Sequence, residues 1–168
     1  MGAMAAFSHV KQIAVIVHDL DIATRTYSDR FGIGPWQLHV YRDWPVTQRG
    51  VVERLDFRIA LAMVGAVEWE LIEPLDDRSI FAEFLRTHGE GIQHIAFGTT
   101  DPAGTLLHRD DGSAVERLGF GEVPGRDGSA LEYIYFDTAQ ELGFVAEAHV
   151  IPEGWVRPDP SGTYPPSA

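Results

Sequence analysis

The sequence predicts an α+β fold made of two similar β-α-β-β-β modules. The segment "QIAVIVHDLD", which begins at Gln12, is similar to "HIAFGTTDPA", which begins at His94. Each starts with a polar residue, continues Ile-Ala and reaches an Asp seven positions later. Strand-like runs follow in both halves, and each half then ends on a glutamate. Glu70 lies 58 positions after Gln12 and Glu147 lies 53 positions after His94, so we expect an internal duplication.

The first module is expected to span residues 9–75. We expect the preceding residues, 1–8, to be disordered or added for expression. The first strand ends at Asp19, a typical N-cap residue for the helix that follows. Apolar residues recur at helical spacing along this helix: Leu20, Ala23, Tyr27 and Phe31. The segment "FGIGPW" then ends it. The runs "VVERLDFRIALAMV" and "AVEWELIEPL" alternate around a turn at Gly65 and predict two strands.

Residues 76–91 are expected to form a connecting helix and a turn, because four apolar side chains again recur at helical spacing: Ile80, Phe81, Phe84 and Leu85. The second module then spans 92–150. Its first strand ends at Asp101, but Gly104 and Gly112 interrupt the helix expected there, which should be short or displaced. "LEYIYFD" and "GFVAEAHVI", on either side of "TAQEL", predict the last strands of this module.

The C-terminal segment, residues 151–168, contains too many prolines for regular secondary structure. We expect an extended tail that lies on the surface or on a neighbouring subunit.

Composition excludes several classes of protein. A net charge of −12 without a cluster of Lys or Arg argues against nucleic-acid binding, because neutralised phosphates supply most of that affinity. No apolar run approaches the roughly 20 residues that span a bilayer, so we expect no membrane segment and a cytoplasmic protein. The absence of cysteine excludes disulfides and thiolate metal sites. Any metal must therefore bind to nitrogen and oxygen ligands.

Four polar residues occupy repeated positions on strand faces that are otherwise apolar: Gln12, Glu70, His94 and Glu147. Burying an unpaired carboxylate is unfavourable, so the two glutamates require a cation or a shifted pKa. With an imidazole nitrogen and an amide oxygen, they form a plausible ligand set for a divalent ion that keeps two or more open positions. The alternative is a buried hydrogen-bond network between the modules.

The quoted segments, together with "ELIEPL", "GEGIQHIAF" and "GFVAEA", resemble the vicinal oxygen chelate superfamily, which includes glyoxalase I, methylmalonyl-CoA epimerase, extradiol dioxygenases and bleomycin-resistance proteins. The resemblance covers about residues 9–150 and is most specific to the epimerases between "ELIEPLDD" and "FAEFLRTHGEGIQHIAF". It implies a curved mixed sheet around a metal-containing cleft, and a homodimer. It also implies one divalent ion (Co, Mn, Ni, Zn or Mg), held here by Gln12, Glu70, His94 and Glu147.

The ligand set departs from that of the epimerases, which have His at the position of Gln12. A Gln, Glu, His, Glu set in this chain order resembles glyoxalase I. The resemblance assigns Glu147 as the base that moves a proton. "GVVE" matches some methylmalonyl-CoA epimerases in which the Glu is a second base, here Glu53. The alternative for Glu53 is a strand carboxylate that pairs with Arg54 or Arg58.

We therefore expect a divalent-metal-dependent epimerase or isomerase that moves a proton α to a carbonyl through an enolate. The substrate would be a small-molecule carbonyl or thioester, including an acyl-CoA thioester. A glyoxalase I-type lyase acting on a hemithioacetal and a non-enzymatic small-molecule-sequestering protein of the same fold stay open. A dioxygenase is disfavoured, because only one of the four positions is His. The nearest candidates for binding CoA phosphates are Arg42, Arg49 and Arg54.

Other side chains receive weaker assignments. His149 shares the face of Glu147 and is a candidate for the pocket lining. Four further histidines are expected in loops or at the surface: His18, His39, His88 and His108. Trp36, Trp44 and Trp69 are expected to pack in the core or in the pocket wall, and Trp36 in "GIGPW" is a candidate for the floor of the cleft.

Overall fold

The computed structural model describes residues 7–99, 108–109 and 111–166. The first module contains β1 (Val10–Ile16), α1 (Leu20–Phe31), β2 (Trp36–Gln48), β3 (Val51–Val64) and β4 (Val67–Pro74). Helix α2 (Ile80–His88) leads to the second module, with β5 (Gly91–Gly98), β6 (Arg117–Pro124), β7 (Ala130–Phe136), α3 (Ala139–Leu142) and β8 (Val145–Val150). A short strand, β9 (Gly162–Tyr164), lies in the tail. The helix predicted to begin at Asp101 lies outside the described residues.

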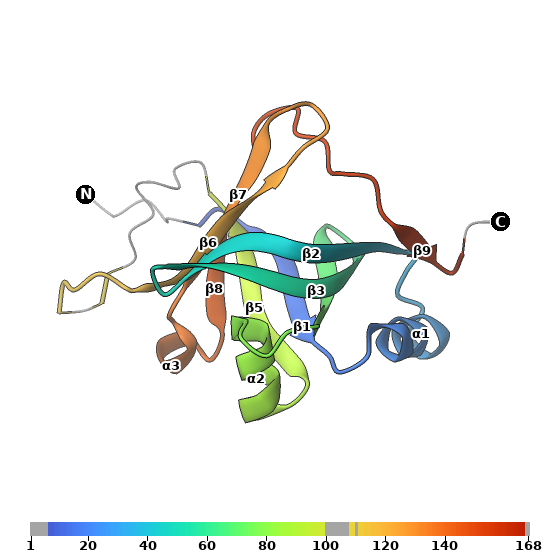
Figure 1. Cartoon of the computed structure of the whole chain (residues 1–168), viewed down its shortest axis with the longest axis horizontal. Helices are drawn as coiled ribbons and strands as arrows, with labels where there is room; N and C mark the ends of the chain where they lie inside the picture. Colours follow the sequence, from blue (N-terminus) through green and yellow to red (C-terminus); the bar gives the residue numbers. More distant parts are fainter. Residues whose placement is uncertain (1–6, 100–107, 110, 167–168) are drawn as a thin grey trace.

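The strands form one mixed sheet in the order β3-β4-β1-β5-β8-β7-β6-β2-β9 (Figure 1). Strand β2 also pairs with β3, so the sheet closes into a barrel. Pairs β1–β4 and β5–β8 are parallel. Between β2 and β6 the barrel closes at two residue pairs, Thr47–Phe120 and Gln48–Gly119. A Cβ atom on Gly119 would lie 3.0 Å from the Thr47 carbonyl oxygen, so this close approach favours glycine. The predicted α+β class and curved mixed sheet are confirmed.

A local twofold relation connects the centres of the two modules. Strands β1 and β5 pair antiparallel, with Gln12 opposite Ala96 and Ala14 opposite His94. Strand β4 then places Glu70 opposite Ala14, and β8 places Glu147 opposite Ala96. Exchanging the modules therefore exchanges Gln12 with His94 and Glu70 with Glu147. The four predicted residues lie on four adjacent strands.

Helix α1 begins and ends as the sequence predicts. The Oδ1 atom of Asp19 accepts a hydrogen bond from the Ile22 amide at 2.8 Å, and Gly32 ends the helix with a φ of 68°. Leu20 is fully buried, whereas Phe31, at the last position of the predicted apolar stripe, is 70% exposed. The buried face of α1 therefore ends before its last turn.

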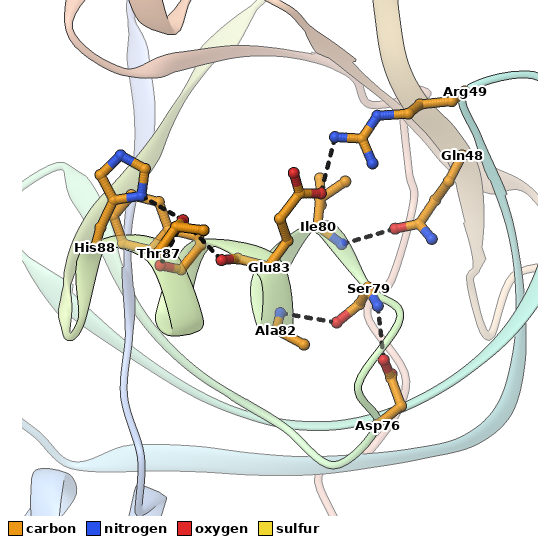
Figure 2. A network of polar contacts seen from close by, with 10 residues as sticks. Gln48, Arg49, Asp76, Ser79, Ile80, Ala82, Glu83, Thr87 and His88 are labelled. Atoms are coloured by element: carbon orange, nitrogen blue, oxygen red, sulfur yellow. Dashed lines mark hydrogen bonds and ion pairs between the residues drawn. The ribbon is translucent and has the colours of Figure 1, made fainter.

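Helix α2 packs against β1, β4 and β5, and polar contacts fix its first turn (Figures 1 and 2). The hydroxyl of Ser79 accepts a hydrogen bond from the Ala82 amide at 3.0 Å, and Asp76 accepts one from the Ser79 amide at 2.7 Å. The Oε1 atom of Gln48, at the end of β2, accepts from the buried Ile80 amide at 2.9 Å. These contacts hold Ile80, and the Phe81 beside it, at the cavity described below.

Substituting Ser79→Ala should lower the free energy of unfolding by about 1–2 kcal/mol, because the Ala82 amide loses its buried acceptor. Chemical unfolding followed by circular dichroism measures this change. Thr87→Ala, at the exposed last turn of the same helix, is the control and should change stability by less than about 0.5 kcal/mol. Equal losses in the two variants would contradict the proposed capping role.

The two chain ends differ from the expectations for them. Phe7 and Ser8 belong to the segment expected to be disordered or added for expression, but Phe7 stacks on Phe97 and the Ser8 amide donates to the Gly98 carbonyl. The tail is extended, but it is not free of regular structure, because β9 pairs antiparallel with Trp36 to Leu38 of β2. The free edge of β2 therefore provides backbone hydrogen bonds that let this short segment form a strand despite the prolines around it. Within the described residues, no helix has the length and apolar character needed to cross a bilayer.

Candidate metal centre

A cavity with about 90 Å³ of space for water lies inside the barrel, and both modules of one chain line it. Its polar lining consists of Gln12, Gln48, Glu70, Tyr41, Tyr133, Tyr135, Glu147, His149 and Arg157. Helix α2 contributes Ile80 and Phe81, and the C-terminal tail contributes Trp155. An open groove beside the pairing of β2 with β6 shares Trp44, Val46 and Tyr133 with the cavity. The cavity is therefore polar on the strands of the twofold centre and largely aromatic or aliphatic elsewhere.

His94 is fully buried on β5, and a neighbouring side chain determines which of its nitrogens is protonated. The pairing of β1 with β5 skips Gln93, and this bulge brings the Gln93 side chain beside the imidazole. The His94 Nδ1 atom lies 2.5 Å from Gln93 Oε1, which can only accept, so Nδ1 carries the hydrogen. The His94 Nε2 atom is buried and has no hydrogen-bond partner among the described residues. Its lone pair is therefore available to a ligand.

The unpaired Nε2 atom of His94 faces two carboxylates. It lies 3.5 Å from Glu70 Oε2 and 3.3 Å from Glu147 Oε2. Within the described part of the chain, the buried Glu147 Oε2 atom likewise has no hydrogen-bond partner. A lone pair held against carboxylate oxygens is unfavourable unless a proton or a cation lies between them.

The two glutamates differ in their electrostatics. Burial raises the pKa of Glu70, and the neighbouring His94 imidazole acts to lower it, but burial together with the negative charges of Glu147 and Glu68 leaves it raised. Burial also acts to raise the pKa of Glu147, but the His149 and His94 imidazoles and the Tyr135 hydroxyl outweigh it and lower that pKa below its usual value. The His149 Nε2 atom lies 3.1 Å from Glu147 Oε1. Glu147 is therefore the carboxylate whose ionised form the surroundings stabilise.

Gln12 is buried on β1, and its amide has a defined orientation. Its Nε2 atom donates to Glu68 Oε1 at 2.8 Å. Because a carboxylate can only accept, the amide nitrogen must face Glu68. The amide oxygen is then the atom that Gln12 can offer to a cation.

These donors fit a divalent cation. Two ligands about 2.1 Å from an ion at right angles to each other lie about 3.0 Å apart, close to the distances from His94 Nε2 to the two carboxylates. In the described part of the chain, no group of three or more His, Cys, Asp or Glu side chains could hold an ion as it stands. Binding therefore requires these side chains to turn towards a common point.

Glu53, the predicted second base, does not line the cavity. Its Oε2 atom lies 3.3 Å from Nη1 of Arg78, and its side chain is 29% exposed. The sequence suggested Arg54 or Arg58 as an alternative partner, but Arg54 pairs with Asp43 and Arg58 pairs with acidic residues elsewhere. The structure therefore brings together Gln12, Glu70, His94 and Glu147, and it leaves Glu53 in a separate ion pair.

Two expectations about aromatic side chains are wrong. His39, expected at the surface, is buried on β2, and its Nε2 atom has no hydrogen-bond partner among the described residues. Burial lowers the pKa of His39, and the Arg157 charge lowers it further. Trp36 does not floor the cleft, because it packs against Leu20 and Tyr27 on the outer side of the sheet. The tryptophans that line the cavity are Trp44 and Trp155.

Four polar contributors to the site were missed from the sequence: Glu68, Gln93, Tyr135 and Arg157. Glu68 lies two residues before Glu70 on the same strand face, so period-two alternation could have identified it. Tyr135 likewise alternates along β7 with Ile134 and Phe136, which belong to a different core cluster. No local pattern indicates the bulge at Gln93, and Arg157 stands in a Pro-rich segment without periodicity.

The three arginines considered for CoA phosphates each pair with a carboxylate of this chain. Arg42 pairs with Asp56 at 3.1 Å, and Arg49 pairs with Glu83 at 2.8 Å. The Arg54–Asp43 pair has a distance of 3.3 Å. A phosphate would have to compete with these carboxylates.

Comparisons with known proteins agree with this architecture. A model of the glyoxalase/bleomycin resistance protein/dioxygenase superfamily matches residues 11–120. Among solved structures, methylmalonyl-CoA epimerase from Mycobacterium tuberculosis is 23% identical with a TM-score of 0.63, over 91% of this chain and 95% of that chain. A Streptomyces coelicolor methylmalonyl-CoA epimerase variant, in complex with 2-nitronate-propionyl-CoA, is 24% identical with a TM-score of 0.60, over 85% and 96%. A methylmalonyl-CoA epimerase in complex with methylmalonyl-CoA and NH4+ is 23% identical with a TM-score of 0.62, over 90% and 99%. At these identities the likeness shows the fold. A search of curated proteins found no match.

Proposed function

Since the chain belongs to the glyoxalase/bleomycin resistance protein/dioxygenase superfamily, we propose that it is a divalent-metal-dependent epimerase or isomerase that moves a proton α to a carbonyl. One observation carries this proposal. The Nε2 atom of His94, which is buried and has no hydrogen-bond partner in the described ranges, faces the carboxylates of Glu70 and Glu147. Such an arrangement is unfavourable by itself and becomes favourable around a cation.

In this proposal Gln12, Glu70, His94 and Glu147 hold one Co, Mn, Ni, Zn or Mg ion. The bound ion supplies positive charge that stabilises the enolate formed when the α-carbon loses its proton. Three oxygen donors and one nitrogen make a hard ligand set, which suits these ions. The largely apolar remainder of the cavity strengthens electrostatic interactions, because apolar walls screen charges poorly.

Glu147 is the proposed base. Its lowered pKa keeps the carboxylate ionised near neutral pH, and Oε2, which has no hydrogen-bond partner among the described residues, can accept a proton when it is not bound to the ion. His149 at Oε1 and the Tyr135 hydroxyl hold the carboxylate in place. The proton taken from the α-carbon returns to the same carbon in epimerisation, or to the neighbouring carbon in isomerisation. Epimerisation needs a second base on the opposite face, and Glu53 can serve only if it leaves Arg78.

The size of the cavity limits what part of a substrate enters it. About 90 Å³ of space for water accepts a small acyl group rather than a whole cofactor. We propose more specifically that the substrate is an acyl-CoA thioester, by analogy with the solved epimerases. Its CoA part would lie in the open groove that shares Trp44, Val46 and Tyr133 with the cavity. The homodimer expected from the resemblance stays a prediction, which the molar mass in solution would test.

A glyoxalase I-type lyase acting on a hemithioacetal is the second candidate. The observation that favours it is that Gln12 and His94 occupy equivalent positions around the twofold centre. The four proposed ligands are then Gln, Glu, His and Glu in chain order, which resembles glyoxalase I. A sequestering protein without metal is disfavoured, because it would have no cation to balance the two buried carboxylates.

Solvent deuterium exchange separates these functions. With Co2+ or Mn2+ bound and methylmalonyl-CoA as the probe, the protein in D2O should incorporate deuterium at the α-carbon without changing connectivity, as mass spectrometry and NMR would show. Exchange with the hemithioacetal of methylglyoxal, with a change in connectivity, would instead support the lyase. Purified protein that holds no divalent ion, and whose thermal stability ignores Co, Mn, Ni and Zn, would support the sequestering protein.

The same assay tests the second base. Glu53→Gln should slow exchange of one methylmalonyl-CoA stereoisomer more than the other, because each base serves one face of the carbon. Normal exchange of both stereoisomers by Glu53→Gln would remove Glu53 from the mechanism and leave it as the ion-pair partner of Arg78.

A further inference from the structure

We propose that Arg157, in the C-terminal tail, is a positioning residue that acts through Glu68 to orient the amide of Gln12 in the metal centre. This inference rests on the proposed function, because the orientation of Gln12 matters for binding only if the cavity holds a cation. Arg157 lies outside both modules and belongs to a segment that the sequence assigns to no function.

An amide ligand has an orientation problem that an imidazole does not share. Its oxygen can bind a cation, whereas its NH2 group cannot, and the two ends have nearly the same shape. At the twofold-related position, Gln93 fixes the orientation of His94 by a contact at Nδ1. Gln12 requires a different partner, one that accepts hydrogen bonds and attracts the amide nitrogen away from the ion. Glu68 has these properties.

Glu68 is the residue opposite Gln12 in the pairing of β1 with β4. Its Oε1 atom accepts from Gln12 Nε2 at 2.8 Å, and the side chain is only 20% exposed. A third carboxylate this close to Glu70 and Glu147 adds negative charge to the site. Without a cation of its own, Glu68 would compete for the metal or turn towards solvent, and the Gln12 amide would lose its partner.

Arg157 supplies that cation. Its Nη2 atom donates to both oxygens of Glu68, at 2.9 and 3.0 Å. The contact joins residues 89 positions apart and fixes the Glu68 carboxylate against rotation. Arg157 is also the only Lys or Arg among the described residues that line the cavity. A series of side-chain contacts, from Arg157 to Glu68 to Gln12, therefore links the tail to a proposed metal ligand.

The tail holds Arg157 in this place from both sides. On one side, the Arg157 guanidinium lies 5.5 Å from the ring centre of Trp155, whose Nε1 atom donates to the Val123 carbonyl at 3.1 Å. On the other side, the Ser161 amide donates to the Leu38 carbonyl at 2.8 Å, and β9 continues the pairing with β2. These contacts restrict the tail to one path across the barrel.

The test measures affinity for Mn2+ and Co2+ by isothermal titration calorimetry on the full chain. Arg157→Met should weaken binding by about 10-fold, the lower end of the effect of removing a direct partner of a metal ligand, because Arg157 acts on Gln12 through Glu68. Arg126→Met is the matched control, since the Arg126–Asp159 pair at 2.8 Å also ties the tail but does not reach Gln12. The control should stay within about twofold of the unmodified chain.

A double-mutant cycle separates positioning from general loosening of the tail. In a Gln12→Leu background, Arg157→Met should cause no further loss of affinity, because the amide on which it acts is gone. Losses that add, or an Arg157→Met affinity within twofold of the unmodified chain, would overturn the inference. If Arg157→Met fails to fold, Glu68→Leu replaces it in the same double-mutant cycle, because Glu68 links Arg157 to Gln12. Absence of metal binding by the unmodified chain would overturn the proposed function as well, so the two failures are distinguishable.

Discussion

Glu147→Gln should abolish α-proton exchange while leaving the fold and the volume of the cavity unchanged. An amide has the same shape as the carboxylate but cannot accept a proton at neutral pH, so the rate of deuterium incorporation should fall by about 10²-fold to 10⁴-fold. The buried carboxylate with an unpaired Oε2 atom is the group that the substitution removes. NMR of methylmalonyl-CoA incubated in D2O with the metal-loaded variant measures this rate.

A matched control is available in the segment before β6. Glu116 is exposed and lines neither the cavity nor the groove, so Glu116→Gln makes the same chemical change away from both. Its exchange rate should equal that of the unmodified chain. If Glu147→Gln retained exchange within tenfold of normal, the base would have to be another group, and the assignment of Glu147 would be wrong.

Glu70→Gln should affect the metal-free and metal-bound proteins in opposite directions. In the metal-free protein, burial and the charges of Glu147 and Glu68 make the ionised Glu70 unfavourable, as its raised pKa indicates. A neutral amide removes this charge, and its NH2 group can donate to the unpartnered His94 Nε2 atom. We expect the free energy of unfolding of metal-free protein to rise by about 1–4 kcal/mol.

The same substitution should lower the affinity for the metal ion, because a neutral oxygen replaces an anionic ligand. Saturating Co2+ or Mn2+ should therefore stabilise the unmodified chain, by about 2.7 kcal/mol at 100 times Kd, and stabilise Glu70→Gln much less. Chemical unfolding with and without a chelator measures both effects. Glu73→Gln on the same strand, which removes an ion pair with Arg58, should lower stability slightly in both states. A metal-free Glu70→Gln variant less stable than the unmodified chain would contradict the account of this carboxylate.

The part of the site that could be predicted from the sequence consists of positions that repeat. Gln12 and His94 each begin a similar segment, and the strand period of two places them on the inner face with Glu70 and Glu147. The caps of α1 and the stripe of α2 also follow from local signals. Such features depend on residues close together in the sequence, which a single chain displays directly.

The remaining features depend on contacts between distant residues. The Arg157–Glu68 contact exists only because β9 pairs with β2 and directs the tail across the barrel. Burial of His39 follows from closure of the barrel around β2, and no property of its neighbours in the sequence indicates it. The alternation along β3 places Glu53 on the strand face that lines the cavity, but its side chain pairs with Arg78 from the segment before α2. Long-range topology decides each of these cases.

The twofold relation between β1 and β5 has a consequence for which side chains can occupy the centre of the barrel. Two identical separate modules would have to contribute the same side chain at the positions of Gln12 and His94, together with the same supporting residues. Joining the modules in one polypeptide removes that constraint. One half then carries an amide supported by Glu68 and Arg157, and the other carries an imidazole supported by Gln93. Covalent fusion thus lets a symmetric scaffold carry chemically different side chains at the two equivalent positions of its centre.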